Sequence, residues 1–111
     1  MAKSNSFDPS REPTAPDAFE STLRNVFMGE EIYIEGARMN YVGKLVSVQS
    51  SGNGTALWFD PLVRVGDWGR QGPEPGSCMT MGNGKPAAIM LSSVEQFGLA
   101  IDGWLKRALG Q

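Results

Sequence analysis

The sequence predicts a mainly β protein: a five-stranded, strongly bent antiparallel small barrel preceded by one α-helix. Apolar residues alternate with polar ones through 30–60 and again through 87–97, which is the period of half-buried strands. Glycines and short polar runs interrupt both stretches where hairpin turns are expected. The segment Thr14–Phe27 instead carries its apolar residues at helical spacing, so it predicts the helix.

The first two predicted strands form a hairpin. Ile32 and Ile34 alternate with polar neighbours, residues 36–38 make a tight turn, and a β-branched second strand follows. Gly43 lies inside that second strand and predicts a bend or the close approach of another backbone segment. Such a bend lets one strand serve both sides of a small barrel. The predicted inward-facing residues are Phe27, Ile32, Ile34, Leu45, Val48, Leu57, Ile89 and Val94.

The remaining strands follow a clear loop at 50–54. The third strand covers 56–59 and is closed by Asp60-Pro61, although Leu62, Val63 and Val65 offer a continuation. The fourth strand is expected at 87–91 and the fifth at 94–99, with only Ser92 and Ser93 between them.

A long loop rich in glycine and proline is expected at about 66–86. Residues 77–81 would form the return limb of a projecting hairpin within it. Loops of this length are often functional. Trp68 is interpreted first as a lid over the apolar rim of the barrel, and alternatively as a contact residue.

Residues 14–111 are expected to form one domain behind a flexible tail at 1–13. Thr14 would cap the N-terminal helix, and Gly29 would end it. At the other end, Asp102 would cap a short amphipathic helix around GWLKRALG. That helix either packs on the barrel or serves as an arm that docks on a neighbour.

Composition restricts the function. The chain has 111 residues, a net charge of −2, no histidine and one cysteine. The acidic balance argues against a duplex-DNA binder, and no apolar run approaches a membrane span. The absence of a signal-peptide pattern and of a cysteine framework predicts a cytoplasmic protein, or a phage or virus protein inside its host. No cofactor and no metal ligand set is expected.

Enzymatic activity is not predicted. Without histidine, neither Ser-His-Asp nor Cys-His catalysis is available. The loop carboxylates at 60, 67, 74 and 102 are not paired at a recognisable spacing, and Cys78 has no identifiable base.

The order of elements resembles the Sm-like family, which includes Sm and LSm proteins and bacterial Hfq. DAFESTLRNVFMGEEIYIEG resembles the N-terminal helix and first strand of Hfq. VGKLVSV resembles the Gly-x-Leu step of the family's second strand, and IMLSSVEQF its second motif, in which a short turn joins strands four and five. The resemblance covers roughly 18–97 apart from the long loop.

The resemblance implies a homo-oligomeric ring of five to seven subunits, in which strand four of one subunit pairs with strand five of the next. The implied interface residues are Ile89, Met90, Leu91, Glu95 and Phe97. It also implies contacts with single-stranded RNA around the pore, and the matching residues here are Gln49, Ser50, Asn53, Ser92 and Ser93.

RNA binding is expected to be weak or atypical. The cationic residues that the family carries between strands four and five are replaced here by MLSS, which neutralises no phosphate. The alternative is a structural or protein-interaction ring with no role in RNA.

Overall fold

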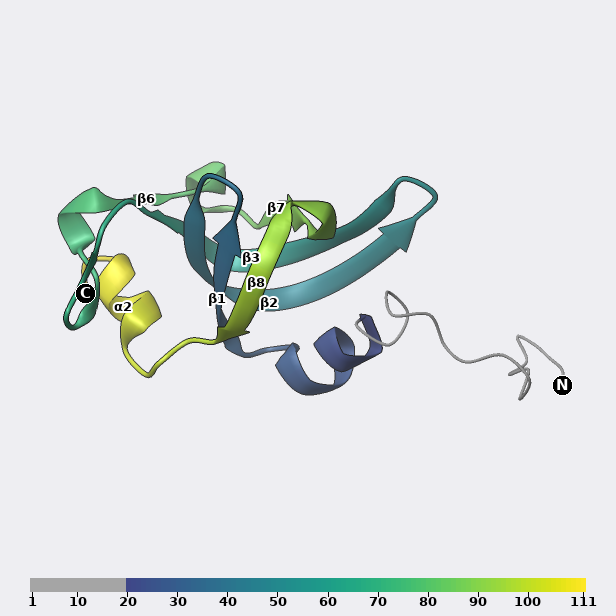
Figure 1. Cartoon of the computed structure of the whole chain (residues 1–111), viewed down its shortest axis with the longest axis horizontal. Helices are drawn as coiled ribbons and strands as arrows, with labels where there is room; N and C mark the ends of the chain where they lie inside the picture. Colours follow the sequence, from purple (N-terminus) through teal and green to yellow (C-terminus); the bar gives the residue numbers. More distant parts are fainter. Residues whose placement is uncertain (1–19) are drawn as a thin grey trace, which may run out of the picture.

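The computed structural model describes residues 20–111, and its main sheet is antiparallel and twisted (Figure 1). Two hydrophobic cores lie on opposite faces of this sheet. Helical structure at the N-terminal end of this range leads into the sheet. The elements are η1 (Leu23–Phe27), β1 (Glu31–Gly36), β2 (Asn40–Ser51), β3 (Gly54–Val65), β4 (Trp68–Gly69), β5 (Gly72–Pro73), η2 (Pro75–Ser77), β6 (Cys78–Thr80), η3 (Gly82–Gly84), β7 (Ala87–Met90), η4 (Leu91–Ser93), β8 (Val94–Leu99) and α2 (Trp104–Ala108).

The main sheet has the strand order β6-β3-β2-β1-β8, and β7 pairs with β3 beside β6. All of its strand pairs are antiparallel. The mainly β, antiparallel prediction and the short N-terminal helix are therefore confirmed. The predicted five-stranded barrel is not confirmed: the main sheet has six strands, and it is not closed, because within residues 20–111 neither β6 nor β7 pairs with β8.

The predicted strands agree with the structure, with three differences in their boundaries. β2 runs to Ser51 and β3 starts at Gly54, so the loop predicted at 50–54 is reduced to a tight turn. The third strand continues through a cis Asp60-Pro61 bond to Val65, because Val63 and Val65 are buried and pair with β6. The fourth strand ends at Met90, and Leu91 opens the 3-10 turn η4. The predicted fifth strand coincides with β8.

The helix prediction is only partly open to test. Residues 20–27 are helical, and the last five of them form the π-helical turn η1. Gly29 follows with a φ of +83° and ends the helix as predicted. The expected cap at Thr14 and the tail at 1–13 lie outside the described residues.

Gly43 marks a close backbone approach, as predicted. A Cβ at this position would lie 2.8 Å from the carbonyl oxygen of Pro61. The β2–β3 register shifts on both sides of Leu45, where the hairpin bends. A residue other than glycine would therefore push the two long strands apart where the sheet curves.

The first core lies under η1, between β1, β2, β3 and β7. Five of the eight predicted inward-facing residues are buried, and the other three, Phe27, Ile89 and Val94, are half-buried against them. The buried members of this core are Leu23, Ile32, Ile34, Leu45, Val48, Leu57, Phe59 and Leu62. Phe59 is fully buried and is the largest of them. The apolar alternation therefore predicted the correct face of the sheet.

The second core lies on the opposite face and was not predicted as a separate unit. Its buried members are Val42, Val63, Val65, Leu105 and Ala108. α2 and the segment 66–78 cover it, so α2 packs on its own chain. The expected helix cap at Asp102 is wrong: Gly103, with a φ of +91°, holds the N-cap position and makes no side-chain cap.

Three aromatic rings close the second core. The rings of Tyr33, Trp68 and Trp104 lie 5.0 to 5.9 Å apart between centroids, in edge-to-face or tilted pairs. Gly72 is buried beneath Trp104, whose ring would lie 2.5 Å from a Cβ at that position. Trp68 is thus a lid, as first interpreted, although it covers this second core. β6 is the predicted return limb of the long loop.

Candidate functional site

The residues predicted to touch RNA fall into two groups on different elements. Gln49, Ser50 and Asn53 lie at the free end of the β2–β3 hairpin, the teal arm that projects from the sheet in Figure 1. Ser92 and Ser93 lie in η4, where the chain leaves the edge of β3 and crosses to β1. All five are exposed. Their convergence on a pore would require assembled subunits, so it stays a prediction.

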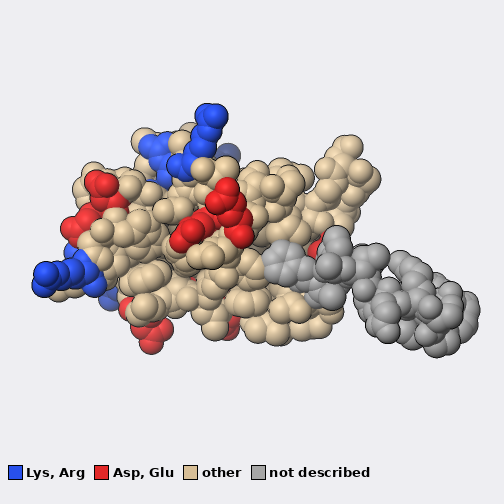
Figure 2. All heavy atoms as spheres, viewed as in Figure 1, with Lys and Arg blue, Asp and Glu red and all other residues tan. Residues whose placement is uncertain are grey.

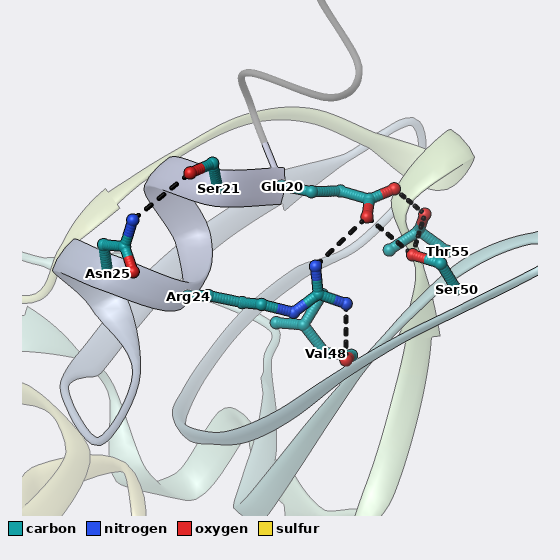
Figure 3. A network of polar contacts seen from close by, with 7 residues as sticks. All are labelled: Glu20, Ser21, Arg24, Asn25, Val48, Ser50 and Thr55. Carbon is teal, nitrogen blue, oxygen red and sulfur yellow. Dashed lines mark hydrogen bonds and ion pairs between the residues drawn. The ribbon is translucent and has the colours of Figure 1, made fainter. Parts of the chain in front are cut away.

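Ser50 has a structural partner within the chain. Its hydroxyl donates to the Glu20 carboxylate at 2.7 Å and lies 3.1 Å from the Thr55 hydroxyl. Thr55 donates to the other oxygen of that carboxylate at 2.6 Å. Figure 3 shows Glu20 reaching from the helix to both hydroxyl groups on the hairpin. Ser50 therefore helps to fix the helix on the sheet.

Arg24 completes this network, which we call the helix clasp (Glu20, Arg24, Ser50 and Thr55). Its guanidinium lies 3.4 Å from Glu20, one helical turn away, and donates to the carbonyl oxygen of Val48 at 3.0 Å (Figure 3). The hydrogen bonds from Thr55 and Ser50, with the nearby Arg24 charge, hold the pKa of Glu20 below its ordinary value of 4.5. The carboxylate form is thus the one that the clasp stabilises.

The other predicted RNA contacts have weak local partners. The Gln49 amide lies 3.4 Å from the Ser47 hydroxyl, and the Asn53 backbone N–H donates to the Ser51 hydroxyl at 3.2 Å. These are neutral hydrogen-bonding groups typical of a turn. They could donate to or accept from a base edge, but they carry no charge for a phosphate.

The predicted interface residues divide between core and surface. Ile89, Leu91 and Phe97 are half-buried against the first core, and the Phe97 ring packs edge-on against Phe27 at 5.0 Å. Met90 is 40% exposed and Glu95 is exposed. Only the last two therefore have exposed side chains, while the other three pack against the first core.

β7 and β8 each pair along one side only among the described residues. β7 pairs with β3 from Ala87 to Met90, and β8 pairs with β1 from Val94 to Leu99. Their other backbone edges carry N–H and C=O groups without a strand partner. β6 likewise pairs only with β3, so the outer edges of β6, β7 and β8 are left without a strand partner among the described residues.

A groove of about 500 Å³ runs between β7 and the β1–β2 hairpin. Its deeper part is formed by Ile34 and Ile89, which belong to or pack against the first core. Its rim carries the half-exposed Met39 and Met90. Ser93 is the only predicted RNA contact that lines it. The strand pattern did not reveal the groove, because it forms between residues distant in the sequence.

Among the described residues, no group of three or more His, Cys, Asp or Glu side chains could hold a metal ion. Burial raises the pKa of the Cys78 thiol, which donates to the Glu74 carbonyl oxygen at 3.3 Å. Glu74 in turn pairs with Arg107 at 3.3 Å. The ion pair between Glu20 and Arg24 could be predicted from its i, i+4 spacing. The contacts of Glu20 with Ser50 and Thr55 could not, because those residues are distant in the sequence.

No helix among residues 20–111 is long and apolar enough to cross a membrane. No protein-family model, no curated protein and no solved structure matches the chain.

Proposed function

We propose that the chain is the subunit of an Sm-like homo-oligomeric ring that assembles through strand edges. The single observation that carries the proposal is the position of β7 and β8: both are end strands of one bent antiparallel sheet, and each has one edge without a partner among the described residues. The bent sheet is then an incomplete small barrel. In the ring, strands of the neighbouring subunits pair with the free edges of β7 and β8.

Exposed strand edges favour this proposal, because an unpaired edge is a template for association unless charge, proline or a bulge protects it. β7 contains neither proline nor a charged residue. Apolar side chains are also exposed at both strands: Met90 is 40% exposed and Leu99 57%. Pairing β7 of one subunit with β8 of the next would satisfy both edges and cover these side chains.

In this proposal RNA contacts remain weak. The predicted pore residues, Gln49, Ser50, Asn53, Ser92 and Ser93, are neutral, and Ser50 is held by the helix clasp. Each chain adds a net charge of −2 to the ring, which repels a polyanion. The ring is thus primarily an assembly of protein surfaces, with any RNA bound through base edges.

The molar mass in solution tests the proposal. Light scattering on the purified chain at micromolar concentration should give five to seven times the chain mass of 12.0 kDa. A monomer at that concentration would contradict it. Fluorescence anisotropy with labelled oligouridine addresses the RNA part: we expect little binding at physiological salt, and tight binding that resists salt would contradict the weak pore.

A further inference from the structure

We infer that the groove between β7 and the β1–β2 hairpin is a binding site for a small amphiphile, a single-chain carboxylate of medium length whose head is held by Arg38 and Arg64. Every residue that lines the groove belongs to one chain. The inference therefore goes beyond the proposed ring and does not depend on it.

The groove has an apolar floor and adaptable walls. Ile34 is fully buried and Ile89 is half-buried against the first core, so the floor is hydrocarbon. Met39 and Met90 lie at the rim and are 42% and 40% exposed. Methionine side chains are unbranched and adapt to the shape of an apolar ligand. An acyl chain in the groove would remove this apolar surface from water.

The dimensions of the groove favour one acyl chain. Its volume of about 500 Å³ lies in the lower part of the range of about 300–1,000 Å³ that is typical of small-molecule sites. β7 borders it along Ala88, Ile89 and Met90, and the four residues of this strand extend about 13 Å at about 3.3 Å each. A single chain of medium length matches this strand, whereas a two-chain lipid is too large for the volume.

Two guanidinium groups lie at the hairpin end of the groove. Arg38 is exposed and lines the groove directly. The Arg64 guanidinium on β3 lies 3.8 Å from the sulfur of Met39, a rim residue. Neither arginine has a carboxylate partner among residues 20–111. Figure 2 shows basic side chains gathered above the β1–β2 hairpin. This end of the groove therefore favours an anionic head group.

A carboxylate suits these groups. The guanidinium of arginine is a planar fork of N–H donors that matches the two oxygens of a carboxylate. The hydroxyl groups of Tyr41 and Ser93, which also line the groove, are further donors for the same oxygens. An uncharged head would lose the charge-assisted hydrogen bonds, and a cationic head would be repelled. At equal chain length, the expected order of affinity is carboxylate, alcohol, quaternary ammonium.

Titration of the full chain with dodecanoate, followed by the signals of isotope-labelled methionine methyl groups, tests the inference. The Met39 and Met90 signals should shift and saturate below the micellar concentration. Met28 is the internal control: it is 37% exposed but follows η1, outside the groove lining, so its signal should stay unchanged. Dodecanol should bind roughly tenfold more weakly, because it forms no charge-assisted hydrogen bond. Dodecyltrimethylammonium should give no saturable shift.

Variants of the two arginines test the head-group contacts. Arg38→Gln and Arg64→Gln should each weaken dodecanoate binding roughly three- to tenfold and leave dodecanol binding unchanged. Arg70→Gln is the matched control, because Arg70 is an exposed cation in the turn between β4 and β5, outside the groove lining. Its affinity should stay within about twofold of the wild type. Thermal unfolding checks that each variant folds.

Three results would overturn the inference. The first is a Met28 shift as large as those of Met39 and Met90, which indicates surfactant adsorption without a site. The second is equal affinity for dodecanol and dodecanoate, and the third is unchanged affinity in both arginine variants. Light scattering on the same samples separates this inference from the proposed function. A monomer that binds dodecanoate overturns the ring alone, and a ring with no saturable shift overturns the groove site alone.

Discussion

The two faces of the sheet are completed in different ways. On the second face, α2 and the segment 66–78 cover Val42, Val63 and Val65, and three aromatic rings close the layer. On the first face, η1 covers part of the core, but a groove reaches Ile34 and Ile89 beside β7. Residues of the same chain thus cover the second face. The first face keeps a groove, with the unpaired edges of β7 and β8 beside it.

This difference shows which apolar surfaces of the sheet are covered by the chain itself. The segment 66–78 and α2, both candidates for external contacts on the sequence alone, pack on the second core of the same chain. The strand β7 and the groove beside it are instead left uncovered among the described residues. Variants that affect one face and spare the other therefore test whether the two faces are separate units.

The largest expected effect is on the first face. Phe59 is fully buried there, so Phe59→Ala removes a large side chain and should lower the free energy of unfolding by about 3–5 kcal/mol. Urea denaturation followed by circular dichroism measures this. Val46→Ala is the control, because Val46 is 43% exposed on the neighbouring strand and should change stability by less than about 0.5 kcal/mol.

On the second face, Gly72→Ala should break the aromatic closure. Gly72 has a φ of +111°, and its Cβ would lie 2.5 Å from the Trp104 ring, so strain and overpacking should cost about 1–3 kcal/mol. Tryptophan fluorescence and near-ultraviolet circular dichroism should change with it. Gly76→Ala meets open space and should leave both signals unchanged. Equal effects of the two variants would show that the aromatic layer does not constrain Gly72.

A smaller effect should separate Ser50 from the other predicted RNA contacts. Ser50→Ala removes a donor to Glu20 and should destabilise the chain by about 0.5–1.5 kcal/mol. Asn53→Ala and Ser92→Ala, at exposed positions outside the clasp, should stay within about 0.5 kcal/mol of the wild type. Thermal unfolding of the three variants decides this, and equal losses would mean that the clasp contributes nothing.

The smallest expected effect concerns pH and the helix clasp. Because the folded-state pKa of Glu20 lies below 4.5, its carboxylate stabilises the fold above that pH, and the contribution is lost as the pH falls through the folded value. The stability difference between wild type and Glu20→Gln should therefore be full at pH 7 and shrink below pH 4.5. Asn25→Ala breaks a neutral pair on the same helix, so its effect should not follow this titration.

Local patterns predicted most of the sheet. Alternation around Ile32, Ile34 and Leu45 identified the strands and the buried face, and Gly43 identified the bend. The second core was not predicted, because Val42 and Val63 pack with residues of α2 that are distant in the sequence. The groove was not predicted for the same reason. Of the predicted site residues, Ser50 has a structural partner that only folding brings near.

Hydrogen exchange as a function of protein concentration tests the central claim most directly. The account predicts that amides of 87–99 and of the β1–β2 hairpin become more protected as concentration rises into the micromolar range, while those of α2 do not change. Protection of β7 and β8 that is independent of concentration, or concentration-dependent protection confined to α2 and the 66–78 segment, would contradict it.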